Sequence, residues 1–373
     1  FIPAQKVLSL CHGIAGLGML AAGYYGMTAG AGAQFGTLFA LYSLSVAFYM
    51  PTIALSNSVA YSGLEKYGLD PVKDFPPIRV FGTVGFICSM LFVNFMKIDG
   101  VQFQMTYNQF LTSGVLGLAL CLYALTLPAC PVNKASGETP SFVDIFGLRA
   151  FTLFRKKDMA IFFIFSMLLG VSLQITNGFA NPFITHFKEI PEFANTWGAQ
   201  NANALISISQ ISETLCILLI PFAMKKFGIK NVMLIAMLAW VLRFGLFGLG
   251  DTGSGVWMLI LSCIVYGVAF DFFNISGSLY VNERTSGSVQ NSAQGLFMLM
   301  TNGIGATVGT LSAQAIVNHF TYSETVMVNG EEMVFTMGDW STCWYIFAGY
   351  ALVVAILFFI LFKAPAKDAP KLV

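Results

Sequence analysis

The chain is 373 residues long, and 56% of its residues are hydrophobic while only 10% are charged. Soluble domains carry about a quarter charged residues, so this composition excludes an ordinary soluble protein and indicates a multi-pass membrane protein. The formal net charge of +1 gives no basic surface for nucleic acid, and we expect no nucleic-acid partner.

Ten stretches of the chain are long and apolar enough to be transmembrane helices. A helix that crosses a bilayer needs about 20 predominantly apolar residues, and such stretches follow one another from end to end. We therefore predict an all-α membrane protein with spans near residues 8–28, 33–57, 79–96, 109–129, 159–185, 200–224, 231–250, 256–281, 291–318 and 342–362.

The basic residues sort to one side of these spans. Lys97 and Lys188 fall on one face of the membrane, Arg243 lies inside a span, and the remaining Lys and Arg residues fall on the other face with both termini. Because cytoplasmic loops carry an excess of Lys and Arg, we predict that both termini are cytoplasmic.

The N-terminal region offers few signals of its own. It opens with FIPAQKV, without a starting Met or a signal-peptide layout, so we expect further residues before position 1. The first span contains GIAGLGMLAAGYYG, and NGIGATVGT follows at 302–310; we expect these glycines to serve helix packing.

The third span carries polar groups near its cytoplasmic end. Arg79, Thr83 and Phe86 follow the rigid DFPPI turn and share one helix face, which brings together a cation, a hydroxyl and a ring. For Arg79 the alternative is ordinary topology, since Arg is common at cytoplasmic helix ends.

The longest polar stretch runs from Cys130 to Asp158 and contains Pro, Gly, Ser and a basic cluster. We predict a cytoplasmic linker at 130–158, preceded at 1–129 by four spans and followed at 159–373 by a six-helix bundle. Transporters of the major facilitator type have two six-helix halves joined by such a loop. On that plan ten of twelve helices are present, and the first two are missing from the N-terminal bundle.

In SLQITNGFANPF, Gln174 and Asn177 lie three residues apart, and Gly178 and Pro182 follow them. We expect local unwinding here, because transporter sites often lie at helix interruptions. Two amides can also read the edge of a flat heterocycle. The alternative is a Pro-kinked helix whose amides satisfy its own freed carbonyls.

Glu213 is the only charged residue in the stretch NALISISQISETLCILLIPFAM. Gln210 lies three residues before it on the same helix face, and Ser207 and Thr214 border that face. Intramembrane ionisable residues point to function, so we expect this stripe to face a water-filled cavity. For Gln210 alone, a structural hydrogen bond between helices is an equal alternative.

In VYGVAFDFFNISG, Tyr266 and Phe270 lie one turn apart and Asp271 follows. The two rings are placed to stack on a planar substrate, although aromatic residues are also common in cores. Asp271 is a candidate proton carrier, because burial shifts a carboxylate towards physiological proton exchange. Its structural alternative is an ion pair with Arg243 on the preceding helix.

The remaining loop, histidine and cysteine residues are not assigned to a functional site. Residues 319–340 form an acidic loop that we expect to be extracytoplasmic, with a hairpin turn at Asn329 and Gly330. The three histidines lie near span ends and receive no role. Six of the seven cysteines lie in or beside spans without metal-ligand spacing, so we expect no disulfide, no metal and no other cofactor.

Long motifs give the chain a resemblance to a known family. They closely resemble the nucleoside:proton symporter family of bacterial nucleoside and xanthosine permeases, within the major facilitator superfamily, and cover nearly the whole chain. The motifs are DFPPIRVFGTVGFI, AIFFIFSMLLG, LQITNGFAN, ISISQISETL, GIKNVMLIAMLAWVLRFGLF, IVYGVAFDFFNISGS and SAQGLFMLMTNG.

The resemblance implies a twelve-helix permease in the bacterial cytoplasmic membrane, whose partners are a nucleoside, a proton and lipid, with no obligatory protein partner. We expect proton coupling through Asp271 and Glu213. The residues that match the family's substrate-binding positions are Arg79, Thr83, Phe86, Gln174, Asn177, Gln210, Glu213, Tyr266 and Phe270, with Asp271 beside them.

Three departures limit what the resemblance implies. On the twelve-helix plan we expect the first helix pair to be missing, the loop at 319–340 is longer and more acidic than expected, and the flanks of Asn177 differ. The preference for purine or pyrimidine nucleosides therefore stays open.

We expect import of nucleoside and proton by alternating access. A proton-coupled symporter for sugars or other small polar solutes is an alternative from the same class. An intramembrane enzyme is a weaker one, because no GxSG, GxGD or HExxH signature is present and no catalytic residue is expected.

Overall fold

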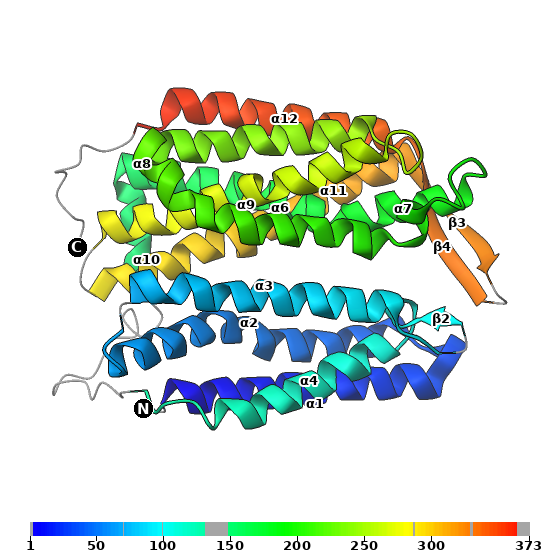
Figure 1. The fold of residues 1–373 in the computed structure, drawn as a ribbon, viewed down its shortest axis with the longest axis horizontal. Helices are drawn as coiled ribbons and strands as arrows, with labels where there is room; N and C mark the ends of the chain where they lie inside the picture. Colours follow the sequence, from blue (N-terminus) through cyan, green and yellow to red (C-terminus); the bar gives the residue numbers. More distant parts are fainter. Residues whose placement is uncertain are drawn as a thin grey trace. The chain divides into compact units, whose positions relative to one another are not determined.

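The computed structural model describes residues 3–69, 71–98, 100–130, 148–285, 288–328 and 331–363. Contacts between Cα atoms divide the chain into two compact units, Phe1–Thr139 and Pro140–Val373 (Figure 1). The described parts are helical apart from two short antiparallel hairpins, as the predicted all-α class requires.

The first unit contains four long helices and, near the end of α3, a hairpin of two strands of two residues each. Pro51 lies inside α2, where transmembrane helices tolerate it because surrounding groups satisfy the freed carbonyl. The elements are α1 (Ala4–Ala29), α2 (Phe35–Lys66), α3 (Pro71–Phe95), β1 (Lys97–Ile98), β2 (Val101–Gln102) and α4 (Asn108–Ala124).

Small residues bring α1 close to α2 and α4. A Cβ added to Gly16 would lie 3.0 Å from the carbonyl oxygen of Gly114, and one added to Gly18 would lie 3.1 Å from Cβ of Ser45. The Ser45 hydroxyl donates to the carbonyl of Ala15 at 2.7 Å. Glycine packing is therefore confirmed in this unit, where backbones approach as closely as small residues permit.

The second unit contains the remaining long helices and an eight-residue hairpin. Its elements are η3 (Leu148–Arg155), α6 (Lys157–His186), η4 (Phe187–Glu189), α7 (Trp197–Gln200), α8 (Ala202–Leu249), α9 (Val256–Arg284), α10 (Ser288–Met298), the π-helical η5 (Leu299–Gly305), α11 (Ala306–Phe320), β3 (Thr321–Val328), β4 (Glu331–Gly338) and α12 (Trp340–Leu361).

Helix α8 turns back on itself at Gly228. A straight helix of 48 residues would be about 72 Å long, more than twice the hydrocarbon thickness. Gly228 has φ 74° and ψ 163°, values outside the helical region that glycine adopts easily. Ser212 before the break and Arg243 after it both contact α9, at Ile264 and Ser262. In a straight helix these residues would be about 46 Å apart, so the chain reverses between them.

Eight helices in the described residues are long and apolar enough to cross a membrane. α8, with its two arms, is counted once among them, and α4 is an apolar helix of 17 residues that falls below that length. The structure thus supports a multi-span helical protein, while ten of twelve helices stays a prediction.

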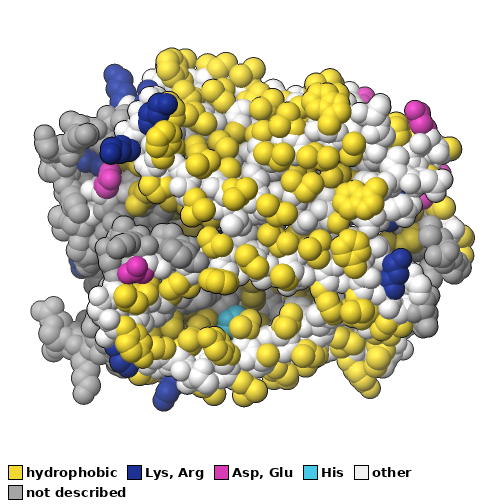
Figure 2. All heavy atoms as spheres, in the orientation of Figure 1, with side chains coloured by type: hydrophobic (Ala, Val, Ile, Leu, Met, Phe, Trp, Pro, Cys, Tyr) yellow, Lys and Arg dark blue, Asp and Glu magenta, His cyan; other side chains and the backbone are white. Residues whose placement is uncertain are grey.

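The surface of the helices is apolar. Large side chains such as Phe222 and Phe359 are 63% and 60% exposed. On the face drawn in Figure 2, hydrophobic side chains cover the sides of the helices, and Lys and Arg side chains lie near helix ends. Such a surface fits a lipid environment, because soluble monomers rarely expose large contiguous apolar patches.

The structure tests two local predictions, the hairpin at 319–340 and the unwinding of α6. The hairpin at 319–340 is confirmed, since Val328 pairs with Glu331; Asn329 and Gly330 lie outside the described residues. The predicted unwinding after Asn177 is wrong, because α6 stays helical from Lys157 to His186 with Pro182 inside. Transmembrane helices tolerate proline where surrounding groups satisfy the carbonyl that it frees.

The predicted linker is described only at its ends. Residues 131–147 lie outside the described part, and η3 (Leu148–Arg155) forms a short helix with Ala150 and Leu153 buried in the second unit. The proposed boundaries at 130 and 158 stay a prediction.

Candidate functional site

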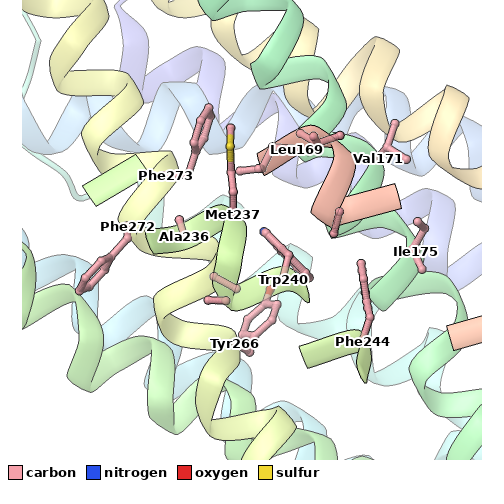
Figure 3. Close-up of a cluster of buried hydrophobic side chains, with 14 of the residues drawn as sticks. Leu169, Val171, Ile175, Ala236, Met237, Trp240, Phe244, Tyr266, Phe272 and Phe273 are labelled. Carbon is pink, nitrogen blue, oxygen red and sulfur yellow. The ribbon is translucent and has the colours of Figure 1, made fainter. Parts of the chain in front are cut away.

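Tyr266 lies at the centre of a polar and aromatic cluster in the second unit. Its ring stacks on that of Phe270 with centroids 5.8 Å apart, and the Trp240 ring lies perpendicular to it with centroids 5.9 Å apart. Figure 3 shows Tyr266 and Trp240 side by side, coming from different helices. The side chain of Gln210 on α8 lies close to the Tyr266 side chain. The predicted spacings thus bring Gln210, Tyr266 and Phe270 together.

Glu213 and Asp271 belong to the same cluster. Both carboxylates are buried, at 5% and 3% exposure, and both are among the charged groups close to Tyr266. A buried carboxylate is costly unless other groups stabilise it or it exchanges a proton. The two carboxylates are therefore the groups of this cluster best suited to carry a proton.

A close helix approach holds these residues near one another. A Cβ added to Gly267 would lie 2.6 Å from the backbone of Ser212, so α8 and α9 touch without an intervening side chain. The Ser212 hydroxyl also donates to the carbonyl of Ile264. Because Ser212 precedes Glu213 and Gly267 follows Tyr266, this contact sets the distance between the two halves of the cluster.

The two predicted amides of α6 occupy a neighbouring helix. Gln174 is half-buried and Asn177 is exposed. A Cβ added to Gly309 of α11 would lie 3.2 Å from Cβ of Gln174. The Gln174 side chain therefore leaves the backbone where α6 and α11 are in close contact. Between the amides, the hydroxyl of buried Thr176 accepts a hydrogen bond from Nε of Arg243 at 3.4 Å.

Arg243 is fully buried and has several partners of its own. Its Nη1 donates to the carbonyl of Ser262 at 2.6 Å, and its guanidinium carbon lies 4.7 Å from the Tyr266 ring centroid. These contacts account for its burial without requiring the ion pair with Asp271 that the sequence left open as an alternative.

The remaining predicted site residues lie on α3, in the first unit. Arg79 and Phe86 are exposed, whereas Thr83 is buried. Within the described residues, the Thr83 hydroxyl has no hydrogen-bond partner. A buried hydroxyl without a protein partner calls for a ligand or a water molecule to satisfy it.

A hollow of about 290 Å³ lies at the hairpin end of the second unit. Its lining includes His186, Asp251 and Asp339. Asp251 accepts backbone hydrogen bonds from Gly253 and Gly255, and Asp339 caps α12. The carboxylates of Asp251 and Asp339 thus accept hydrogen bonds from nearby backbone N–H groups. Among the described residues, no group of three His, Cys, Asp or Glu is placed to hold a metal ion.

Sequence reasoning missed the residues that support the cluster. These residues contact site residues or Arg243, and they are Thr176, Ser262 and Trp240. Their residue types do not distinguish them from the other polar and aromatic residues of the spans. A usable signal was Arg243 itself, since a buried Arg requires nearby acceptors.

Comparisons with known proteins show that the chain is similar to nucleoside transporters. The family model described as "Nucleoside H+ symporter" matches residues 1–367. Xanthosine permease of Escherichia coli (strain K12) is 50% identical over 316 residues, which cover 84% of this chain and 71% of the permease. Nucleoside permease NupG of the same organism is 44% identical over 367 residues, covering 97% of this chain and 81% of NupG.

Solved structures give the same likeness. A crystal structure of an aspartate-to-alanine variant of the nucleoside transporter NupG matches with a TM-score of 0.82 and 42% identity, covering 97% of this chain and 84% of that one. A bacterial homologue of the lysosomal transporter Spinster matches with a TM-score of 0.62 at 15% identity, which indicates a shared fold alone.

Proposed function

The chain belongs to the nucleoside H+ symporter family, and from that premise we infer that it imports nucleosides together with protons. It is a multi-pass protein of the inner membrane and a secondary active transporter that works by alternating access. The sugar-symporter and enzyme alternatives are not favoured, because the relatives that match across most of the chain are nucleoside transporters.

The observation that carries the site proposal is the buried cluster around Tyr266. Tyr266 and Phe270 present stacked rings, and Gln210 presents an amide beside them. In our proposal the rings stack on the nucleobase and Gln210 bonds its edge, because aromatic faces favour stacking and amides offer a donor and an acceptor side by side. Gln174 and Asn177 supply further amides from α6.

The carboxylates divide the remaining tasks. Glu213 accepts hydrogen bonds from the sugar hydroxyls, and Asp271 carries the proton, with Glu213 coupled to it. One charge that moves down a membrane potential gains about 2.3 kcal/mol per 100 mV. Since about 1.4 kcal/mol corresponds to a tenfold ratio, this step supports concentration of the nucleoside inside the cell.

The proposal also includes three residues of the first unit as substrate-binding residues. Arg79, Thr83 and Phe86 provide a cation, a hydroxyl and a ring from α3. The unpartnered hydroxyl of Thr83 supports a ligand contact at this helix. Residues 1–129 and 159–373 form the two helix bundles, 130–158 links them, and both termini of the chain face the cytoplasm.

Uptake into proteoliposomes that contain the whole transporter tests this function. Labelled uridine, adenosine and xanthosine are supplied with and without an inside-alkaline pH gradient. We expect gradient-driven accumulation of at least one nucleoside. Asp271→Asn should abolish accumulation while binding persists, because an amide cannot carry a proton. Glu213→Gln should raise KM, since it removes the charged acceptor of the sugar hydroxyls.

Glu324→Gln is the matched control, because Glu324 is an exposed carboxylate on β3. It should transport as the parent does. Uptake of all three nucleosides that stays flat under every gradient, by correctly folded protein, would contradict the proposal. Accumulation that persists in Asp271→Asn would remove Asp271 from proton coupling.

A further inference from the structure

Arg243 is a buried charge that the transport steps above do not use. It lies on the second arm of α8 with 0% exposure. Its polar contacts reach two other helices: Nε donates to the Thr176 hydroxyl of α6, and Nη1 donates to the Ser262 carbonyl of α9. The Ser262 hydroxyl donates back to the Arg243 carbonyl at 2.9 Å. One side chain thus connects the second arm of α8 to α6 and α9, the helices that hold Gln174, Asn177, Tyr266, Phe270 and Asp271.

The guanidinium also lies over two aromatic rings. Its central carbon is 4.7 Å from the Tyr266 centroid and 4.8 Å from the Phe247 centroid. A cation at this distance is attracted to a ring face, and the attraction strengthens away from water. Trp240 meets the Tyr266 ring edge-on, with an interplanar angle of 89°. Tyr266 is therefore held by a cation, a perpendicular ring and the stacked ring of Phe270.

We propose that Arg243 is a positioning residue for substrate binding, which fixes the Tyr266 ring and, through Thr176, ties α6 to it. The inference rests on the proposed function, because it takes Tyr266 as a ring that receives the nucleobase. Arg243 acts through Tyr266 and α6, and it does not contact the nucleoside itself.

The geometry requires arginine in particular. A guanidinium is planar, so it can face aromatic rings while its in-plane N–H groups donate to a carbonyl and a hydroxyl. The ammonium of lysine is a compact point charge and cannot make both kinds of contact in one orientation. An ammonium that faces the rings would leave the Ser262 carbonyl without this donor. Arg243→Lys therefore keeps the positive charge and loses the orientation of the donor groups.

A double-mutant cycle in the whole transporter tests the proposal. KM and maximal rate are measured in proteoliposomes for the nucleoside that the parent carries best among uridine, adenosine and xanthosine. Arg243→Lys should raise KM roughly tenfold, because the ammonium cannot face the rings and donate to both acceptors in one orientation, with the maximal rate changed less than about twofold. In a Tyr266→Leu background the same substitution should raise KM by less than about twofold, since its target ring is gone.

Phe358→Leu is the control for general destabilisation. Phe358 is fully buried and packs on Phe165 and Phe362 in the same unit, away from the contacts of Arg243. It should lower Tm while leaving KM near that of the parent. If Arg243→Lys does not fold, Thr176→Val and Phe247→Leu replace it, because each removes one of its contacts and keeps the cation. Each should raise KM about threefold, in a manner that depends on Tyr266.

Independent effects of Arg243→Lys and Tyr266→Leu on KM, or an unchanged KM in Arg243→Lys, would overturn the positioning role alone. A parent protein that accumulates none of the three nucleosides overturns the proposed function and this inference with it. The two failures are therefore distinguishable in one set of vesicles.

Discussion

Asp339 caps helix α12 with both carboxylate oxygens. Oδ1 accepts the backbone N–H of Thr342 at 3.0 Å, and Oδ2 accepts the Thr342 hydroxyl at 2.6 Å. The hydroxyl and the N–H together hold the pKa of Asp339 below its ordinary value. The charged form is the better acceptor, so the cap stabilises α12 most when Asp339 is ionised.

We expect Asp339→Ala to lower the free energy of unfolding by about 1 kcal/mol at pH 7, the usual effect of losing such a cap. The folded-state pKa lies below the unfolded one, so the charged cap stabilises the protein above about pH 4 and loses this effect as the pH falls through the lower folded value. The difference in Tm between parent and variant should therefore shrink between pH 6 and pH 3.

Asp339→Asn serves as the control, because asparagine caps helices without titrating. Its Tm relative to Asp339→Ala should stay constant with pH. A parent whose advantage over Asp339→Ala is the same at pH 3 and pH 6 would contradict a charge-dependent cap.

At the scale of residues, the sequence revealed polar groups that stand out in apolar surroundings. Glu213 and Asp271 were found because a carboxylate in a span is rare, and their helices bring both close to Tyr266. Thr176 and Ser262 could not be found in this way. Serine and threonine in helices often bond their own backbone, as Ser166 does with Phe162, so the letter does not reveal a partner on another helix.

At the scale of helices, the contact between α8 and α9 depends on Gly267. We expect Gly267→Ala to separate the two helices, because the added methyl would lie 2.6 Å from the Ser212 backbone, which cannot move as a side chain would. Overpacking of this kind costs about 1–3 kcal/mol. The variant should lose Tm and should also lose affinity for nucleoside, measured by equilibrium binding.

Gly245→Ala is the matched control on α8. A Cβ there would meet nothing within 4 Å, so the change should leave Tm unchanged or raise it, since alanine favours helix by up to about 1 kcal/mol. Equal losses of affinity in both variants would show that the Gly267 contact has no special effect on the site.

Two elements show where sequence patterns succeed and fail. The hairpin of β3 and β4 was predictable, because Asn-Gly is a strong turn signal between strand-like segments. The unwinding of α6 was predicted wrongly from Gly178 and Pro182, because a membrane helix tolerates proline when surrounding groups satisfy the freed carbonyl. Periodicity cannot weigh those surroundings.

At the scale of the whole molecule, the division into two units predicts that the chain can be made in two pieces. We expect halves separated between residues 139 and 140 and produced together in cells to restore uptake of labelled nucleoside, because each compact unit buries its own helix contacts. Each half alone should give none, since substrate-binding residues are proposed in each unit. Uptake by the second half alone would contradict a substrate-binding role for Arg79, Thr83 and Phe86.

The family was evident from long motifs in the sequence, and the family model matches residues 1–367. What the sequence could not provide is the set of contacts between helices, such as those of Arg243, because these depend on side-chain directions across helices distant in the chain.

The reversal of α8 at Gly228 has a consequence for the order of synthesis. Glu213 is made with the first arm of α8, and Asp271 follows 58 residues later on α9, after the turn and the second arm. At about 5–20 residues per second, a ribosome needs roughly 3–12 s to cover that interval. During this time the newly made carboxylate of Glu213 is without Tyr266, which α9 brings, and a carboxylate left in lipid is costly until α9 emerges.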